Sequence, residues 1–318
     1  MSQPFTYPRR RFLKAAASLG ALAAVSGCAS FIGKAKPKVV VIGGGFGGAT
    51  VARYLALWGE GGVDITLVER NPRFVSCPMS NLVLIGRRPL EDITFTYGGL
   101  AAKGIRVVQG EVTAIAPDQR KVRLADGGEL PYDRLVVAPG IEFMWDTITG
   151  LATPAAREAT PHAWKAGPQT VLLQQQLQAM KDGGVFAIAI PKAPYRCPPG
   201  PYERACLVAD YLKQHKPKSK VLILDANENV VSKKALFTGV WQNRYRNIIE
   251  YRHSSELKEV HLASRCAVLE FDDVKFDVLN VIPPQRAGEI AKSMRTVNSC
   301  PCTGILGEGF GGFVLQIP

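Results

Sequence analysis

Cysteine is the residue type in this sequence whose placement most clearly offers chemistry. Six cysteines follow Cys28, and each could act as a nucleophile or redox partner or remain a buried structural residue. They are Cys77, Cys197, Cys206, Cys266, Cys300 and Cys302. No CxxC pair and no Cys/His cluster with zinc-ligand spacing occurs among them, so a metal site is not expected.

Cys197 lies in the proline-rich turn PKAPYRCPPGPYERA, between a predicted buried strand at 184–190 and a helical pattern from Tyr202 to Leu212. The prolines stiffen this turn. A helix dipole is expected to lower the pKa of the Cys197 thiol and favour its thiolate. Core packing is the expectation for Cys206 and Cys266, which sit in apolar patterns.

The elements that must position such chemistry begin with KVVVIGGGFGGATVARYLALW, a pattern of strand, glycine turn and helix. The strand is Val39–Ile42, the helix starts near Gly47, and the GxGxxG glycines are Gly43, Gly45 and Gly48. A second strand at 63–68 ends in Glu69, whose carboxylate is expected to accept hydrogen bonds from ribose hydroxyls. This spacing predicts a dinucleotide-binding unit with the pyrophosphate at the helix N-terminus.

A second βαβ unit follows, without the glycines that bind a pyrophosphate. Its strands are predicted at 184–190 and at 220–224, the latter ending in Asp225. The turn between the first of these strands and the helix contains several prolines and only one glycine, Gly200. Because proline lacks an N–H group, this turn is not expected to hold NAD(P)H.

The N-terminus has the pattern of an export signal. PRRRFLK precedes the short apolar segment AAASLGALAAVSGCAS, and the paired arginines resemble the twin-arginine signal, which predicts a periplasmic protein. The alternatives are an N-terminal anchor helix and a lipid anchor at Cys28, since residues 25–28 resemble a lipobox. An oxidising compartment would permit disulfides.

Composition narrows the function classes. The chain has 318 residues, 47% hydrophobic and 21% charged, which excludes a disordered or fibrous protein. The net charge is +12, but six basic residues and no acidic one lie within residues 1–36. No basic cluster interleaved with aromatics remains, so nucleic acid is not an expected partner. No mature transmembrane helix is expected either.

Two further segments resemble the two-dinucleotide flavoproteins of the glutathione-reductase type. LPYDRLVVAPGIE, residues 130–142, is similar to the strand that returns to their FAD domain, and Gly140 then marks the crossing to the next domain. GEVTAI, residues 110–115, is similar to the strand that meets the adenine near Val112. The resemblance implies FAD as the first nucleotide.

Longer motifs resemble the flavoprotein subunit of flavocytochrome c sulfide dehydrogenase. They are IPKAPYRCPPGPYERACLVADYLKQHKPKSKVLILD, VLNVIPPQRAG, HAWKAGPQT and FVSCPMSN. The resemblance implies that Cys77 carries FAD through a thioether and that Cys197 belongs to a redox disulfide beside the flavin. It implies oxidation of sulfide to polysulfide or sulfur, with electrons passed to a c-type cytochrome subunit. No CxxCH occurs here, so that haem would belong to another chain.

Two other residues near these motifs have open roles. Glu203, six residues after Cys197, is a possible proton acceptor, although a solvent-facing helix carboxylate is the favoured interpretation. His162 is a possible packed surface ring.

The end of the sequence departs from the family's pattern. The family's second redox cysteine follows the PPQRAG segment, and Cys300 is the candidate here, with Cys302 a weaker one. The expected Gly-Asp after an apolar strand is absent beyond residue 290, so a truncated or frameshifted ending is expected. This ending puts FAD retention and partner docking in doubt.

The overall expectation is an α/β chain with two Rossmann-like dinucleotide-binding domains of the glutathione-reductase type, lacking the C-terminal interface domain. The expected organisation is 1–30 export signal, 36–150 FAD-binding domain, 151–280 degenerate NAD-like domain, and 281–318 atypical return to the FAD domain. The alternatives to a sulfide dehydrogenase are a sulfide–quinone oxidoreductase and an inactive chain that binds at most FAD or a partner.

Overall fold

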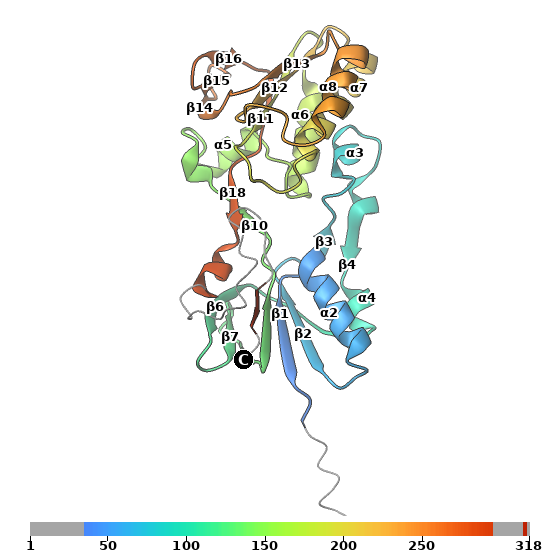
Figure 1. The fold of residues 1–318 in the computed structure, drawn as a ribbon, viewed down its shortest axis with the longest axis vertical. Coiled ribbons are helices and arrows are strands. Elements are labelled where there is room, and N and C mark those ends of the chain that lie inside the picture. The colour runs from blue at the N-terminus through green and yellow to red at the C-terminus, as the bar shows by residue number, and fades with distance from the viewer. Residues whose placement is uncertain (1–34, 295–313, 317–318) are drawn as a thin grey trace, which may run out of the picture. The chain divides into compact units, whose positions relative to one another are not determined.

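The computed structural model describes residues 35–294 and 314–316 (Figure 1). The chain divides into two units, Met1–Pro37 and Lys38–Pro318, and every element below belongs to the second. The predicted export signal at 1–30, Cys28, Cys300 and Cys302 lie outside the described residues. Within the described ranges, no helix has the length and apolar character needed to cross a membrane.

The first sheet contains the predicted dinucleotide unit. Its strand order is β19-β9-β1-β2-β5, and β1 pairs in parallel with both β2 and β9. The bounds are β1 Lys38–Ile42, β2 Asp64–Glu69, β5 Arg106–Gln109, β9 Arg134–Val137 and β19 Val314–Gln316, with helix α2 at Phe46–Trp58. The crossover from β1 through α2 to β2 is therefore the βαβ unit that the sequence predicts.

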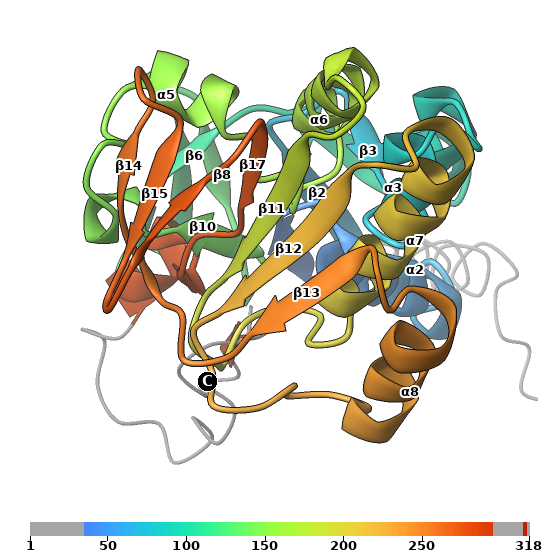
Figure 2. The same ribbon diagram turned by 90° about the horizontal axis from the view of Figure 1, so that it is seen from above.

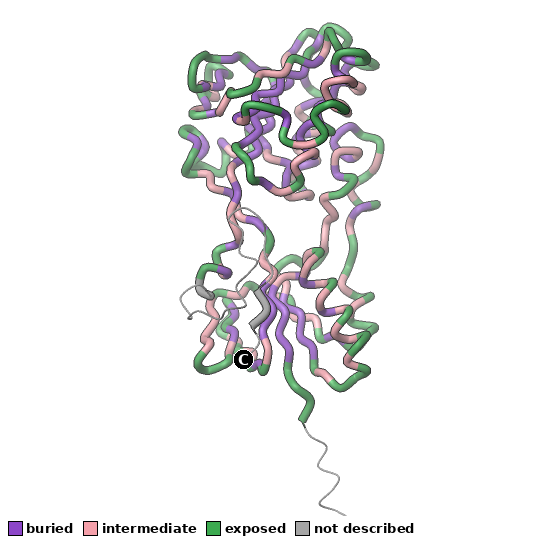
Figure 3. Tube along the Cα trace, in the orientation of Figure 1, coloured by how far each residue is buried: buried purple, intermediate pink, exposed green. Residues whose placement is uncertain are grey.

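Both faces of this sheet are buried, which explains the continuous apolar runs of its strands (Figure 3). On one face Val39, Val41 and Leu67 pack with Ala52 of α2. On the other face Val40, Ile42 and Val68 pack with residues of a small antiparallel sheet. That sheet consists of β6 Val112–Ala116, β7 Lys121–Leu124 and β8 Glu129–Pro131.

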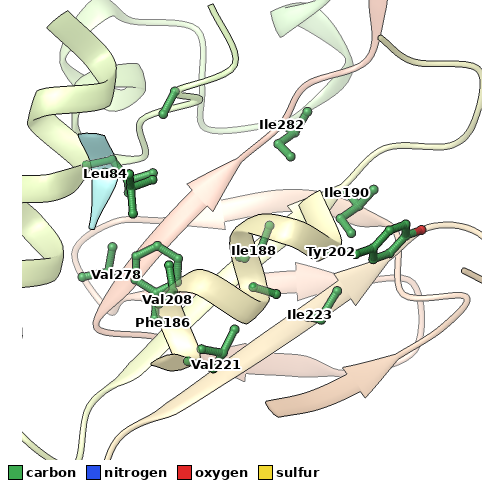
Figure 4. Close-up of a cluster of buried hydrophobic side chains, with 14 of the residues drawn as sticks. Leu84, Phe186, Ile188, Ile190, Tyr202, Val208, Val221, Ile223, Val278 and Ile282 are labelled. Atoms are coloured by element: carbon green, nitrogen blue, oxygen red, sulfur yellow. The ribbon is translucent and has the colours of Figure 1, made fainter. Parts of the chain in front are cut away.

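The second sheet is fully parallel, in the order β13-β12-β11-β17 (Figure 2). The bounds are β11 Val185–Ile190, β12 Lys220–Asp225, β13 Ile249–Arg252 and β17 Val278–Val281, with helices α6 Pro168–Ala179, α7 Gly200–His215 and α8 Lys234–Arg244. Figure 4 shows Phe186, Ile188 and Ile223 of the sheet beside Tyr202 and Val208 of α7. This packing holds the N-terminus of α7 at the end of β11.

The opposite face of the second sheet packs on β14 to β16. Ala187, Ala189 and Leu222 alternate with the residues that face α7, as expected from the two-residue period of a strand. The bounds here are β14 Leu257–His261, β15 Cys266–Leu269 and β16 Asp273–Lys275. Cys266 is 6% exposed, which confirms its expected role in core packing.

Two short strands lie in the chain segments that lead from the first sheet to the second and back. β10 (Ile141–Phe143) and β18 (Gln285–Ala287) pair antiparallel, with Glu142 opposite Arg286 and Phe143 opposite Gln285. The remaining elements are β3 Arg73–Val75, α3 Ser80–Leu84, η2 Leu90–Ile93, β4 Thr94–Thr96, α4 Gly98–Ala101, η3 Trp145–Thr147, α5 Pro154–Ala159 and η4 Glu289–Met294.

The α/β class and the parallel strands of the two Rossmann-like units confirm that part of the expected fold class, although β19 pairs antiparallel with β9 in the first sheet. The strand expected within residues 130–142 is β9 at Arg134–Val137, and α2 begins one residue earlier than predicted. The predicted domain boundaries at 150 and 280, the glutathione-reductase type and the missing interface domain stay predictions.

The glycine turn predicts different effects of two alanine substitutions on the stability of the fold. A Cβ on Gly48 would lie 1.8 Å from the carbonyl oxygen of Gly43, whereas a Cβ on Gly45 would have no atom within 4 Å. Gly48→Ala should therefore destabilise the fold by about 3 kcal/mol or more. Gly45→Ala, whose φ of −71° suits alanine, should leave the free energy of unfolding near that of the wild type. Urea unfolding monitored by circular dichroism measures both, and equal stabilities would contradict the packing described.

Candidate functional site

The glycine turn after β1 presents an open helix N-terminus. Gly43 has a φ of +96°, and a Cβ there would lie 2.2 Å from the carbonyl oxygen of Ala138, so both backbone and packing require glycine. Gly45 caps α2 and faces open space. The first N–H groups of a helix lack intrahelical partners and favour anions. This is the geometry a pyrophosphate needs.

Glu69 ends β2 beside the same turn. One carboxylate oxygen accepts the Gly44 N–H at 2.7 Å, and the other accepts the backbone and side-chain N–H groups of Asn71 at 2.9 and 2.7 Å. A carboxylate can accept about four hydrogen bonds, so Glu69 retains capacity for a ligand hydroxyl. These residues together fit the adenosine-pyrophosphate part of FAD.

Cys77 lies half-buried in the loop between β3 and α3. Its thiol points to the carbonyl oxygen of Trp164 at 3.6 Å, and the Arg196 guanidinium donates to its sulfur at 3.3 Å. Arg196 also donates to the same Trp164 carbonyl, and its backbone N–H donates to Gln285 Oε1 at 3.0 Å. Arg196 therefore ties the Cys77 loop to the turn that carries the next residue, Cys197.

Cys197 is exposed and has a φ of +60°, in the left-handed region that non-glycine residues rarely adopt. Its carbonyl accepts the N–H of Gly200, the first residue of α7, at 2.9 Å. The prediction of a lowered thiol pKa was wrong. Desolvation by the protein around the sulfur raises the pKa of Cys197, and the Gly200 N–H only partly offsets this effect.

Arg204 is the largest fully buried side chain of the site, at 2% exposed. It donates to Asn81 Oδ1 at 3.0 Å, Asn280 Oδ1 at 2.7 Å, and the carbonyls of His162 and Ala163 at 3.2 and 2.6 Å. All four acceptors are neutral. Burial lowers the pKa of Arg204 to about 10, so its guanidinium remains a cation at neutral pH.

His162 is a packed ring whose polar atoms serve the backbone. Its Nδ1 accepts the N–H of Trp164 at 2.8 Å, and the ring lies 4.4 Å from that of Phe143. Burial, with the nearby cations Lys165 and Arg204, lowers the pKa of His162 to about 3. The ring is therefore neutral at physiological pH.

In the second βαβ unit, the position where a nucleotide would bind in a dinucleotide-binding fold is filled by side chains of the protein. Asp225, at the end of β12, is fully buried and accepts the hydroxyls of Tyr202 and Tyr251 at 2.7 and 3.1 Å. Its other oxygen accepts the side-chain and backbone N–H groups of Asn227 at 2.8 and 3.0 Å, so all four acceptor positions are used. Tyr195 fills the proline-rich turn and is 1% exposed. No acceptor is left for a ribose at this acid.

Three further predicted residues, Val112, Gly140 and Glu203, make none of the hydrogen bonds described above. Val112 begins β6, is half-buried and pairs with Leu124. Gly140 has a φ of +72°, and its carbonyl accepts the Gly288 N–H at 3.0 Å at the β10–β18 crossing. Glu203 is exposed, which confirms its favoured interpretation.

Cys206, the next cysteine along α7, is half-buried and accepts the indole N–H of Trp241 at 3.3 Å, which is consistent with packing. Cys77, Cys197, Cys206 and Cys266 are free thiols in this structure.

The side chains that join these segments were not predicted from the sequence. Arg204 could have been noticed, because it stands four residues before Val208 and eight before Leu212 on the apolar stripe of α7. Arg196, Trp164 and Gln285 lie within the quoted motifs, but nothing in their spacing signals mutual contact.

Comparison with known families agrees with these observations. Residues 170–283 match the model described as the sulfide dehydrogenase (flavocytochrome c) flavoprotein chain, central. Residues 37–172 match the pyridine nucleotide-disulphide oxidoreductase model. Both matches confirm the resemblance drawn from the sequence motifs.

Curated relatives and solved structures include sulfide:quinone oxidoreductases. The mitochondrial enzyme of Dictyostelium discoideum is 29% identical over 85% of this chain and 60% of its own length, and that of Mus musculus is 25% identical over 82% and 60%. The chain thus spans about 60% of these relatives. The enzyme of Aquifex aeolicus shares the fold, with a TM-score of 0.69, 24% identity, and coverage of 81% and 61%.

The neutral His162 predicts a loss of stability in acid. Its pKa is about 3 in the folded protein and 6.5 as the ordinary value, so only the unfolded state takes up a proton between these limits. The stability contribution of the neutral ring is full above pH 6.5 and falls as the pH drops toward 3. Between pH 8 and pH 5, the wild type should lose about 2 kcal/mol more stability than His162→Asn, whose side chain can still accept the Trp164 N–H. Urea unfolding at both pH values measures this difference, and parallel losses would contradict it.

Proposed function

We propose that this chain, matched to the sulfide dehydrogenase flavoprotein model over 170–283, is an FAD-dependent oxidoreductase that oxidises sulfide. The observation that carries the proposal is the pair of cysteines joined through Arg196. Cys77 and Cys197 come from segments about 120 residues apart, yet Arg196 precedes one and contacts the sulfur of the other. The turn that carries Cys197 replaces a nucleotide-binding turn.

FAD would be held by the residues of the first sheet. The N-terminus of α2 receives the pyrophosphate, with Gly43, Gly45 and Gly48 allowing its approach, and Glu69 accepts ribose hydroxyls. Val112 would lie toward the adenine and Gly140 would mark the crossing to the second domain, as the family resemblance implies. Bound FAD supplies a two-electron acceptor that can release electrons singly to a partner. The self-filled site around Asp225 supports the expectation that NADH is not the electron donor.

Cys77 is proposed to hold FAD covalently through a thioether. The wild-type protein should then stay yellow after acid precipitation, with the flavin on the peptide that contains residue 77. Cys77→Ser should release all flavin under acid, while Cys206→Ser, which changes a cysteine away from Arg196, should retain it. Absorbance of the pellet and peptide mass spectrometry measure both. Free flavin in the acid supernatant of the wild type would contradict the thioether.

The sulfur chemistry is assigned to a disulfide of Cys197, with Cys300 as the candidate partner. Hydrosulfide attacks the sulfur of Cys197, the S–S bond breaks, and the partner leaves as a thiolate while Cys197 carries the persulfide. The exposed Cys197 is the accessible sulfur. Its raised pKa makes the Cys197 thiolate a poor leaving group.

The charge around the site suits an anionic substrate. Arg204 is a buried cation, and the Arg196 guanidinium donates to the sulfur of Cys77 and the carbonyl of Trp164. Lys165 is a further cation, although burial lowers its pKa. Hydrosulfide carries a negative charge, so these cations favour its approach, while Glu203 and Glu142 offset part of their charge.

Cys197→Ser should abolish sulfide-dependent reduction of the flavin, because a hydroxyl forms neither a disulfide nor a persulfide. Anaerobic stopped-flow absorbance with sodium sulfide measures the rate, and dithionite should still bleach the variant's flavin. Cys266→Ala, a change in the core behind the second sheet, is the matched control and should react at the wild-type rate. Wild-type kinetics in Cys197→Ser would remove the proposed mechanism.

Two electron acceptors have support. The family name of the 170–283 match favours a c-type cytochrome subunit as partner. The curated relatives named sulfide:quinone oxidoreductases favour a quinone as the second candidate. Turnover of the purified protein with a soluble c-type cytochrome, compared with turnover with a short-chain quinone in detergent, distinguishes them.

A periplasmic location belongs to the same proposal, with export by the twin-arginine route and lipidation at Cys28 as a variant of it. The twin-arginine route carries folded proteins, which suits a chain that must bind FAD before it crosses the membrane.

A further inference from the structure

Two buried hydrogen-bond donors near Cys77 have no partner within residues 35–294. Trp164 is 6% exposed and Gln285 is 8% exposed, yet the indole Nε1 of the first and the amide Nε2 of the second find no acceptor in this part of the chain. A buried donor without an acceptor costs about 1–3 kcal/mol. Such atoms in a folded protein indicate a ligand or another group that supplies the acceptor.

The orientation of the Gln285 amide is fixed by its neighbour. Its Oε1 accepts the backbone N–H of Arg196 at 3.0 Å, so this end must be the oxygen. The NH₂ group is therefore the end left over. Gln285 stands on β18 opposite Phe143 of β10, where the antiparallel pair limits its movement.

The Trp164 ring is equally constrained. A Cβ on Gly200 would lie 2.7 Å from this ring, so α7 begins directly against it. The Arg204 guanidinium lies 5.2 Å from the ring centre on one face, and Tyr195 contacts it edge-on at 6.5 Å. The ring cannot turn to find another acceptor without breaking this packing.

Both residues are linked to the predicted attachment cysteine through Arg196. The Arg196 guanidinium donates to the carbonyl of Trp164 and to the sulfur of Cys77, the latter at 3.3 Å. The backbone N–H of Arg196 donates to Oε1 of Gln285. A flavin ring joined to Cys77 would lie within this group of residues. That ring carries carbonyl oxygens and ring nitrogens, which are hydrogen-bond acceptors.

We propose that Trp164 Nε1 and Gln285 Nε2 donate hydrogen bonds to acceptor atoms of the isoalloxazine ring and thereby favour its reduced form. The inference rests on the proposed function, since it requires FAD beside Cys77. Reduction places electron density on the ring's oxygens and nitrogens, so donors fixed beside them stabilise the reduced state more than the oxidised state. The two residues thus set the position and the reduction potential of the flavin.

The test uses the full-length flavin-containing protein and two substitutions that each remove one donor. Gln285→Glu keeps the oxygen that accepts the Arg196 N–H, and Trp164→Phe keeps an aromatic ring. Tyr132→Phe is the matched control, because the Tyr132 hydroxyl is also buried and unpartnered but belongs to the segment after β8. The readouts are the visible flavin spectrum and the two-electron midpoint potential, measured without sulfide.

Each donor variant should shift the flavin absorption bands and weaken the reduced form at least tenfold relative to the oxidised form, which is about 30 mV for two electrons. Tyr132→Phe should leave both readouts unchanged. If one donor variant fails to fold, the other still decides the outcome.

A wild-type spectrum and potential in the folded donor variants would overturn the inference while leaving the proposed function intact. The same holds if their only defect were a higher KM for sulfide, because the donors would then contact the substrate. A wild-type protein that binds no FAD, even with FAD added, would instead remove the proposed function and the inference with it.

Discussion

The guanidinium of Arg204 is the interaction on which the arrangement of the site depends. It joins α7, α3, β17 and the 162–163 segment through four hydrogen bonds to neutral acceptors. Burying an unpaired cation costs several kcal/mol, and each charge-assisted hydrogen bond returns about 1.5–3 kcal/mol. The cation is therefore tolerated only while all these segments stay in place. Asn280 reinforces them by donating to the carbonyls of Pro161 and His162.

The second βαβ unit illustrates how one fold can exchange a nucleotide site for a thiol. The parallel strands and the helix remain, but the acid at the end of β12 accepts tyrosine hydroxyls, and Tyr195 fills the turn. Prolines before α7 remove N–H groups that a phosphate would need. What remains at the helix start is an exposed thiol on a stiff turn, so the same position in the fold offers a sulfur atom instead of a phosphate-binding loop.

The sequence predicted what is local and missed what is distant. The glycine turn, its helix and Glu69 follow from spacing along one segment, because a βαβ unit is a continuous stretch of chain. Arg204 and Asn81 are 123 residues apart, and Arg196 and Cys77 are 119 apart, so no periodicity could reveal these contacts. The predicted lowering of the Cys197 pKa was wrong for a related reason. The helix N-terminus can be recognised in the sequence, whereas the desolvation that outweighs its effect comes from other segments of the chain.

Backbone strain accumulates beside the two sulfurs. Met79, Ala163 and Cys197 all have positive φ, of 70°, 43° and 60°, although none is a glycine. Each such residue costs on the order of 1 kcal/mol or more, so other contacts must hold it. Met79 lies two residues before Asn81, the carbonyl of Ala163 itself accepts from Arg204, and Cys197 follows the anchored Arg196. The hydrogen bonds of two arginines thus stabilise the backbone near three strained positions. This backbone in turn holds the loops that carry Cys77 and Cys197. A chain that folds around these cations keeps its sulfurs oriented before any substrate arrives.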